Sequence, residues 1–199
     1  MLVMLIGKTC SGKNTIVTEL KKNGWDVITT YTTRPIRKNE RDGVEYRFIS
    51  NKEFFEKEKN GDFIESKSYS VNGNTWFYGS PKEDILKATR DNNLHVIILT
   101  PAGVQDICKQ LNNKSDKYQI YYLYANRITI LKRLNKRKDS NDSIKRRMDA
   151  DEMDFKDATN IANKIIYNDN ARIADVANKI AEYSIQYLRN RIKGNYLLI

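Results

Sequence analysis

The sequence predicts an α/β fold, with a parallel sheet core flanked by helices and a smaller β-rich lobe inserted into it. Short apolar runs, typical of strands buried on both faces, alternate with longer segments in which apolar residues recur every three or four positions. The first apolar run, residues 1–6, leads directly into the glycine-containing segment 7–15 and then into a helical pattern. Strand, glycine loop and helix in this order are what a P-loop requires.

The elements of the predicted core follow from these two patterns. The expected strands are mostly apolar runs, and they cover residues 3–6, 25–30, 94–99, 118–124 and 164–167. The expected helices have one apolar side, and they cover residues 15–22, 101–111, 127–136 and 143–155, a segment that starts at Ser80-Pro81, and a last helix from about residue 171. This alternation predicts parallel strands joined by right-handed crossovers.

The segment 31–79 lacks this alternation and is rich in Tyr, Arg and strand patterns. It contains expected strands at 44–49, 62–70 and 74–77, and a helix over 51–59 that Ser50 and Glu53 can cap. We therefore expect one domain over residues 1–199. It would consist of a core (1–30 and 80–199), an inserted β-rich lobe (31–79), and an arginine-rich lid at about 136–143.

Charge is concentrated in one part of the chain. The protein has 199 residues and a net charge of +10, and residues 127–147 alone contain nine Lys or Arg against two Asp. Such a cluster is a solvated helical face, a nucleic-acid patch or a clamp for phosphates. The order of the motifs favours the phosphate clamp.

The sequence also indicates the cellular compartment in which the protein is expected. Cys10 and Cys108 are too few for a disulfide framework, and no secretory signal or membrane-spanning run is present in the sequence. We expect a cytoplasmic protein. The single histidine, His95, opens an apolar run and is expected at the edge of a strand rather than in a catalytic role.

The glycine loop predicts a site for the phosphates of ATP. Glycines let backbone N–H groups converge on phosphate oxygens, and the following helix start adds its dipole. Lys13 would place a positive charge at the β- and γ-phosphates. Asn14 stands where Ser or Thr usually binds Mg²⁺, so we expect weak or water-mediated metal binding through its carbonyl oxygen. The residues expected to bind ATP here are Gly7, Cys10, Ser11, Gly12, Lys13, Asn14 and Thr15.

A second motif lies in residues 31–48, where Arg34 and Arg37 stand three positions apart and Tyr46 follows a glycine turn. A guanidinium can bind two oxygens of one phosphate, and a tyrosine hydroxyl adds a donor without charge. The alternative is an ordinary charged surface loop.

This second motif, Thr-Thr-Arg-x-x-Arg-x-x-Glu-x-Asp-Gly-x-x-Tyr-x-Phe, resembles the nucleotide-monophosphate loop of the guanylate kinase family. The resemblance extends over nearly the whole chain, through the P-loop, Phe63-Ile64-Glu65, Tyr78-Gly79-Ser80, the arginine-rich segment and Asn168-Asp169. It implies phosphorylation of GMP, and of dGMP, by ATP with Mg²⁺, and it implies that the inserted lobe (31–79) binds the nucleoside monophosphate.

The resemblance also implies roles for single residues. Arg34, Arg37, Tyr46 and Tyr78 would hold the phosphate of GMP, and Thr30, Glu65 and Ser80 would read guanine. A carboxylate at Glu65 suits the adjacent N1–H and amino donors of guanine, which adenine lacks, although an ordinary strand glutamate is the alternative. Arg133, Arg137 and Arg147 would act with Lys13 and Arg37 in catalysis. Asn168 would lie near the adenine of ATP.

The chain departs from the family after the expected strand 94–99. Most members have an Asp-x-Asp pattern there, whereas this chain has Ile98 and Thr100 at the two acidic positions. Thr100 is expected to supply a weaker oxygen to the GMP site. Together with Asn14 this alters two positions related to the metal.

Two other functions compete with a guanylate kinase. One is a kinase with a different acceptor base, motivated by Thr100. The other is a non-catalytic binding module, which would be expected to lose Lys13 and the lid arginines that this chain keeps. The expected partners are ATP and GMP, with neither nucleic acid nor membrane, and the oligomeric state stays open.

Overall fold

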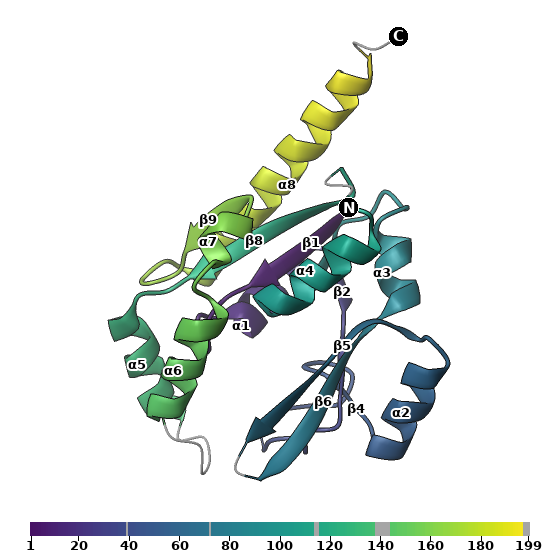
Figure 1. Ribbon diagram of the computed structural model, residues 1–199. Helices are drawn as coiled ribbons and strands as arrows, with labels where there is room; N and C mark the ends of the chain where they lie inside the picture. Colours follow the sequence, from purple (N-terminus) through teal and green to yellow (C-terminus); the bar gives the residue numbers. More distant parts are fainter. Residues whose placement is uncertain (39, 72, 114–115, 138–143, 197–199) are drawn as a thin grey trace.

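The computed structural model describes residues 1–38, 40–71, 73–113, 116–137 and 144–196. They form two sheets, of which the larger has five strands in the order β2-β7-β1-β8-β9 (Figure 1). These strands are β1 (Leu2–Ile6), β2 (Asp26–Ile28), β7 (His95–Ile98), β8 (Tyr118–Tyr124) and β9 (Lys164–Tyr167). All of their pairings are parallel, which confirms the predicted fold class.

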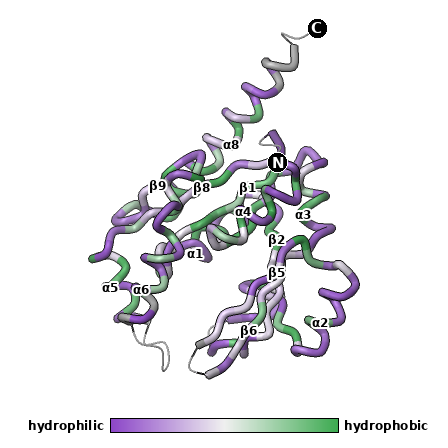
Figure 2. Tube along the Cα trace, in the orientation of Figure 1, coloured by the Kyte–Doolittle hydropathy of each residue, from purple (hydrophilic) through white to green (hydrophobic). Residues whose placement is uncertain are grey.

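Strand β1 is the centre of the core. All five of its residues are buried, because helices cover both faces of the sheet (Figure 1). On one face, Val3 and Leu5 pack with α1 (Lys13–Lys22) and α8 (Ile173–Tyr196). On the other, Leu2, Met4 and Ile6 pack with α3 (Lys82–Ala88) and α4 (Pro101–Gln110). Figure 2 shows the apolar residues concentrated along this strand and its neighbours.

The smaller sheet has the order β4-β3-β6-β5. Its strands are β3 (Tyr31–Thr32), β4 (Arg47–Phe48), β5 (Phe63–Val71) and β6 (Asn74–Pro81). Helix α2 (Asn51–Lys59) covers it through Phe54, which is fully buried and contacts the rings of Phe63 and Phe77. The expected capping box of Ser50 and Glu53 is confirmed.

Three further helices lie beside the larger sheet: α5 (Arg127–Arg137), α6 (Ile144–Asp154) and α7 (Ala158–Ile161). Ile130 and Leu134 of α5 form a small cluster that Cys10 and Met148 adjoin. The apolar sides of α5 and α6 are therefore directed at the start of α1. Of the expected lid, residues 138–143 lie outside the described part of the chain.

Several sequence expectations were wrong in detail. The expected strand 44–49 is reduced to Arg47–Phe48, because Gly43 adopts φ +75° and residues 43–45 form a turn instead. Strand β3 and helix α7 were not expected, since both are too short to produce a periodic pattern. Pro81 caps α3 rather than lying in its first turn. His95 opens β7 as expected, but it is buried in the sheet and bonds Asp91 at 2.7 Å.

Helix α8 extends beyond the body of the protein toward the C-terminus (Figure 1). Its buried residues Val176, Ala177 and Ile180 lie in its first half, where they pack against α1 and the sheet. In the described part of the chain, no helix is long and apolar enough to cross a membrane.

Candidate functional site

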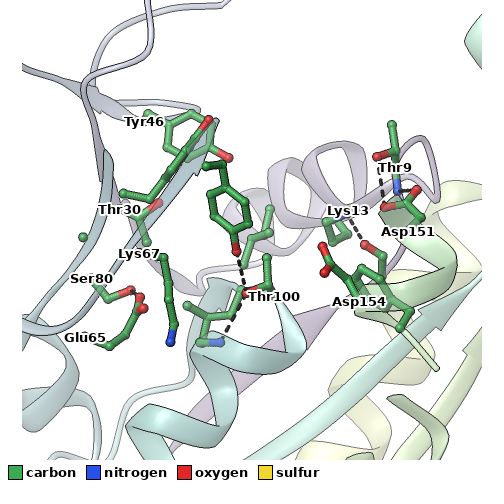
Figure 3. Close-up of a pocket in the computed structure, with 18 residues that line it drawn as sticks. Thr9, Lys13, Thr30, Tyr46, Glu65, Lys67, Ser80, Thr100, Asp151 and Asp154 are labelled. Atoms are coloured by element: carbon green, nitrogen blue, oxygen red, sulfur yellow. Dashed lines mark hydrogen bonds between the residues drawn. The ribbon is translucent and has the colours of Figure 1, made fainter. Parts of the chain in front are cut away.

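A pocket of about 270 Å³ lies between the two sheets (Figure 3). The larger sheet contributes the ends of β1 and β7 with the loops that follow them, and the smaller sheet contributes β5 and β6. A second cavity of about 650 Å³ adjoins it along the glycine loop and shares Lys13, Tyr46 and Tyr78 with it. Ligands at the carboxyl ends of parallel strands are typical of open α/β sheets.

The glycine loop after β1 has the conformation that a phosphate site needs. Gly12 has φ +104° and lies directly before α1, so the first N–H groups of that helix have no side-chain cap. Gly7 cannot carry a side chain, since a Cβ atom there would lie 2.7 Å from the carbonyl oxygen of Leu123. The hydroxyl of Ser11 is buried, and among the described residues it finds no hydrogen-bond partner.

The ammonium of Lys13 lies over this loop. Its Nζ donates to the carbonyl oxygens of Gly7 at 2.5 Å and Lys8 at 3.1 Å. The side chain lines both cavities. The loop therefore holds a positive charge at the point where the two cavities meet.

Arg133 connects the glycine loop to the segment after β9. Its guanidinium donates to the carbonyl oxygens of Cys10 and Ser11, both at 3.1 Å, and to those of Asn168 and Asp169. In this conformation Arg133 stabilises the loop, and its expected role on the ATP phosphates stays a prediction.

Asn168 acts at the same place. Its side chain is buried and donates to the carbonyl oxygen of Ser11 at 2.7 Å. The expected contact with adenine would require this amide to serve two partners. In the structure this amide stabilises the glycine loop through Ser11. The contact of Asn168 with ATP stays a prediction.

The arginine motif after β3 is arranged around a glutamate. Arg34 donates to both carboxylate oxygens of Glu40 at 2.9 Å, and the two side chains are only 6% and 9% exposed. Glu40 also accepts from the backbone N–H of Arg37 at 3.0 Å. Sequence reasoning included Glu40 in the motif but assigned it no role. Here it is the residue that fixes both arginines at the edge of the cavity.

Replacing Glu40 by Ala is expected to lower the free energy of unfolding by about 3 kcal/mol, because a buried guanidinium would lose its paired charge. Denaturant unfolding followed by circular dichroism measures this change. The matched control is Glu56→Ala on the exposed side of α2. Equal unfolding free energies for the two variants would contradict the prediction.

Three tyrosines contact one another at the first pocket, and two of them, Tyr46 and Tyr78, also line the second cavity. The ring centroids of Tyr46 and Tyr78 are 5.8 Å apart, and those of Tyr69 and Tyr78 are 5.5 Å apart. Burial raises the pKa of Tyr46 to about 12. Its hydroxyl therefore stays a neutral hydrogen-bond donor over the whole physiological range.

Glu65 and Ser80 meet across the pair β5 and β6. The Ser80 hydroxyl donates to the Glu65 carboxylate at 2.5 Å (Figure 3). Burial is the largest effect on Glu65 and raises its pKa, while the Ser80 hydrogen bond acts in the opposite direction. Thr30 lines the same pocket. The structure thus brings together the three residues expected to read guanine.

Thr100 is mainly a helix cap. Its hydroxyl accepts from the backbone N–H of Gly103 at 3.2 Å, and Tyr69 approaches it at 3.5 Å. Asn14 lies on the exposed first turn of α1 and lines the second cavity. Among the described residues, no group of three His, Cys, Asp or Glu side chains could hold a metal.

Four pocket residues with ionisable side chains were missed by sequence reasoning: Lys67, Tyr69, Asp151 and Asp154. Asp151 of α6 accepts from the backbone N–H of Thr9 at 2.8 Å, and burial raises its pKa. Lys67 and Tyr69 share the face of β5 with Glu65, so alternation along that strand was an available signal. The side chains of Arg137 and Arg147 lie outside the described part of the chain.

Comparison with known proteins accounts for this combination of sites. A family model described as guanylate kinase matches residues 1–185. The chain belongs to the guanylate kinase family. The guanylate kinase of Malacoplasma penetrans is 29% identical over 179 residues, 87% of each protein.

Other members of the guanylate kinase family match over different lengths. That of a Synechococcus strain is 29% identical over 174 residues, 85% of this chain and 76% of its own length. That of a Nostoc strain is 32% identical over 108 residues, so the alignment spans about half of that protein. The crystal structure of guanylate kinase from Anaplasma phagocytophilum superposes on this chain with a TM-score of 0.69 and 18% sequence identity. The match includes 94% of this chain and 85% of that protein. That structure has the same fold.

Proposed function

We propose that this protein transfers the γ-phosphoryl group of ATP to GMP, and to dGMP, giving ADP and the nucleoside diphosphate. One observation supports this most directly: Lys13 of the glycine loop and the Glu65–Ser80 pair line the same pocket. A donor phosphate and an acceptor base would thus be held on opposite sides of one space. Membership of the guanylate kinase family points to the same reaction.

In the proposed reaction an oxygen of the GMP phosphate attacks the γ-phosphorus, and the bond to the β-phosphate oxygen breaks. The acceptor phosphate is already a nucleophile, so the protein contributes position and charge. Lys13 would bind the β- and γ-phosphates. Arg34, Arg37, Tyr46 and Tyr78 would hold the acceptor phosphate, with Arg133, Arg137 and Arg147 on the ATP side.

Mg²⁺ is part of the proposal because hard oxygen donors lie where ATP would bind. The amide oxygen of Asn14 is at the start of α1, and Asp151 contacts the glycine loop at Thr9. Asn14 would hold the ion directly or through water, together with the ATP phosphates. Bound Mg²⁺ would neutralise charge on the β- and γ-phosphates.

We further propose that residues 31–79 act as the acceptor lobe and 136–143 as a lid over the donor. Closure of both would exclude water from the reaction. A cytoplasmic location is proposed on the grounds that the substrates are intracellular nucleotides. The thiol state of Cys10 and Cys108 suits a reducing compartment.

The test is a coupled assay that detects ADP, run with ATP, Mg²⁺ and one acceptor at a time from a panel of GMP, dGMP, IMP, AMP, CMP and UMP. We expect turnover with GMP and dGMP, and equal amounts of ADP and diphosphate product. A preference for a base other than guanine would show that the acceptor is not GMP. The presence of Thr100 where most family members have an acidic residue would then be the first explanation to test. Failure to bind ATP in calorimetry would favour a binding module instead.

A further inference from the structure

Lys67 lines the acceptor pocket beside Glu65. Both residues belong to β5 and stand two positions apart, so their side chains leave the strand on the same face. Figure 3 shows Lys67 beside Glu65, both among the residues that line the pocket. The chain therefore places a cation next to the carboxylate expected to read the acceptor base.

Asp106 holds Lys67 in this place. The ammonium of Lys67 forms an ion pair with the carboxylate of Asp106 on α4. The first turn of α4 also approaches Glu65, since a Cβ atom on Gly103 would lie 3.6 Å from the Glu65 carboxylate. The charged groups that face Glu65 are thus Lys67 on its own strand and Asp106 on the packed helix.

The charge state of Glu65 decides which base it can bind. An ionised carboxylate only accepts hydrogen bonds, and it matches the two adjacent donors of guanine. A protonated carboxyl group has one donor and one acceptor, and it matches the ring nitrogen and amino group of adenine. Burial favours the protonated form by raising the pKa of Glu65, and the Asp106 carboxylate acts in the same direction, whereas the Ser80 hydrogen bond and the Lys67 ammonium lower that pKa.

Resting on the function proposed above, we propose that Lys67 is a specificity-determining positioning residue. Held by Asp106, it keeps Glu65 an ionised double acceptor and so favours guanine over adenine. Lys67 does not itself contact the base in this proposal. It acts through the carboxylate.

The test compares Lys67→Met with Lys67→Arg and with Lys52→Met, an exposed control on α2 of the same lobe. For each variant, kcat/KM is measured with GMP and with AMP from pH 5 to pH 8. The ionisation of the GMP phosphate near pH 6 is common to all variants and cancels in the comparison.

Removing the Lys67 charge raises the pKa of Glu65, so the acid limb of kcat/KM for GMP moves to higher pH. We expect a shift of about half a pH unit for Lys67→Met, the size typical of a partly exposed charge pair. That shift corresponds to about a threefold loss of kcat/KM for GMP at acid pH. Little change is expected at pH 8 or in kcat at saturating GMP. The GMP-to-AMP preference should fall on the same acid limb, and Lys67→Arg should restore both.

An acid limb in Lys67→Met that coincides with the wild-type limb would overturn the proposal. So would a loss that is equal at all pH values, or one that arginine does not rescue, since either would indicate a structural role. Absence of GMP turnover in the wild type would overturn the proposed function instead. In that case the affinity for GMP, measured by calorimetry over the same pH range, tests Lys67 separately.

Discussion

Replacing Lys13 by Met is expected to reduce kcat by about 10²- to 10³-fold, the effect typical of removing one preorganised group that stabilises developing charge. Methionine is unbranched and only one atom shorter than lysine, but it cannot donate to the phosphates. The loss should appear in kcat more than in the KM for GMP, because Lys13 is proposed to act on the transferred group. Steady-state kinetics with both substrates measures it.

This variant needs a control for stability, because Lys13 also bonds the carbonyl oxygens of Gly7 and Lys8. Losing those bonds costs on the order of 1 kcal/mol, which is too little to unfold a domain of ordinary stability. Lys21→Met, on an exposed part of the same helix, is the matched comparison. Activity of Lys13→Met equal to that of Lys21→Met would remove the proposed role.

The second large effect is expected at Glu65. Changing it to Gln should lower kcat/KM for GMP by about 10²- to 10³-fold, because charge-assisted hydrogen bonds to guanine are lost and an amide N–H meets a base donor. Size and shape are preserved, and Gln can still accept from Ser80. Kinetics with GMP and AMP at pH 8 measure the change in preference.

Glu83→Gln on α3 controls for the loss of one negative charge on an exposed surface. The prediction fails if Glu65→Gln retains the wild-type preference for GMP over AMP. It then follows that other groups of the pocket, such as Thr30 or Ser80, read the base.

Sequence alone predicted the fold because local and long-range signals agree. The apolar run at β1, the glycine loop and the amphipathic α1 follow one another without interruption. Each of these sequence patterns is typical of one kind of structure: a buried strand, a tight loop and a helix with one buried side. The exceptions are elements whose existence depends on distant partners. Strand β3 has two residues and pairs with β4 and β6, so no periodic pattern in its own sequence could reveal it.

Sequence reasoning located many of the residues that line the pocket, but it did not indicate how they pair. Motif spacing located Arg34 and Glu65, yet it could not indicate that Glu40 neutralises Arg34 in a nearly buried pair. Likewise, Arg133 was expected to act on phosphates, whereas in the structure it donates to four backbone carbonyls. The Arg133 contacts join residues far apart in the chain, and the Arg34–Glu40 pair depends on the conformation of the loop between them, so only the folded backbone reveals either.

The position of β1 has a consequence for how the protein is made. It is synthesised before the other strands of the larger sheet, yet it lies in the middle of that sheet, between β7 and β8. Residues 2–6 therefore have no partner strand until synthesis has passed residues 95–98 and 118–124. During that time an apolar segment of the nascent chain is exposed, and folding must wait for contacts of large sequence separation. The glycine loop, which β1 supports, thus leaves the ribosome before the two strands that flank β1 and can bind a nucleotide only after they have paired with it.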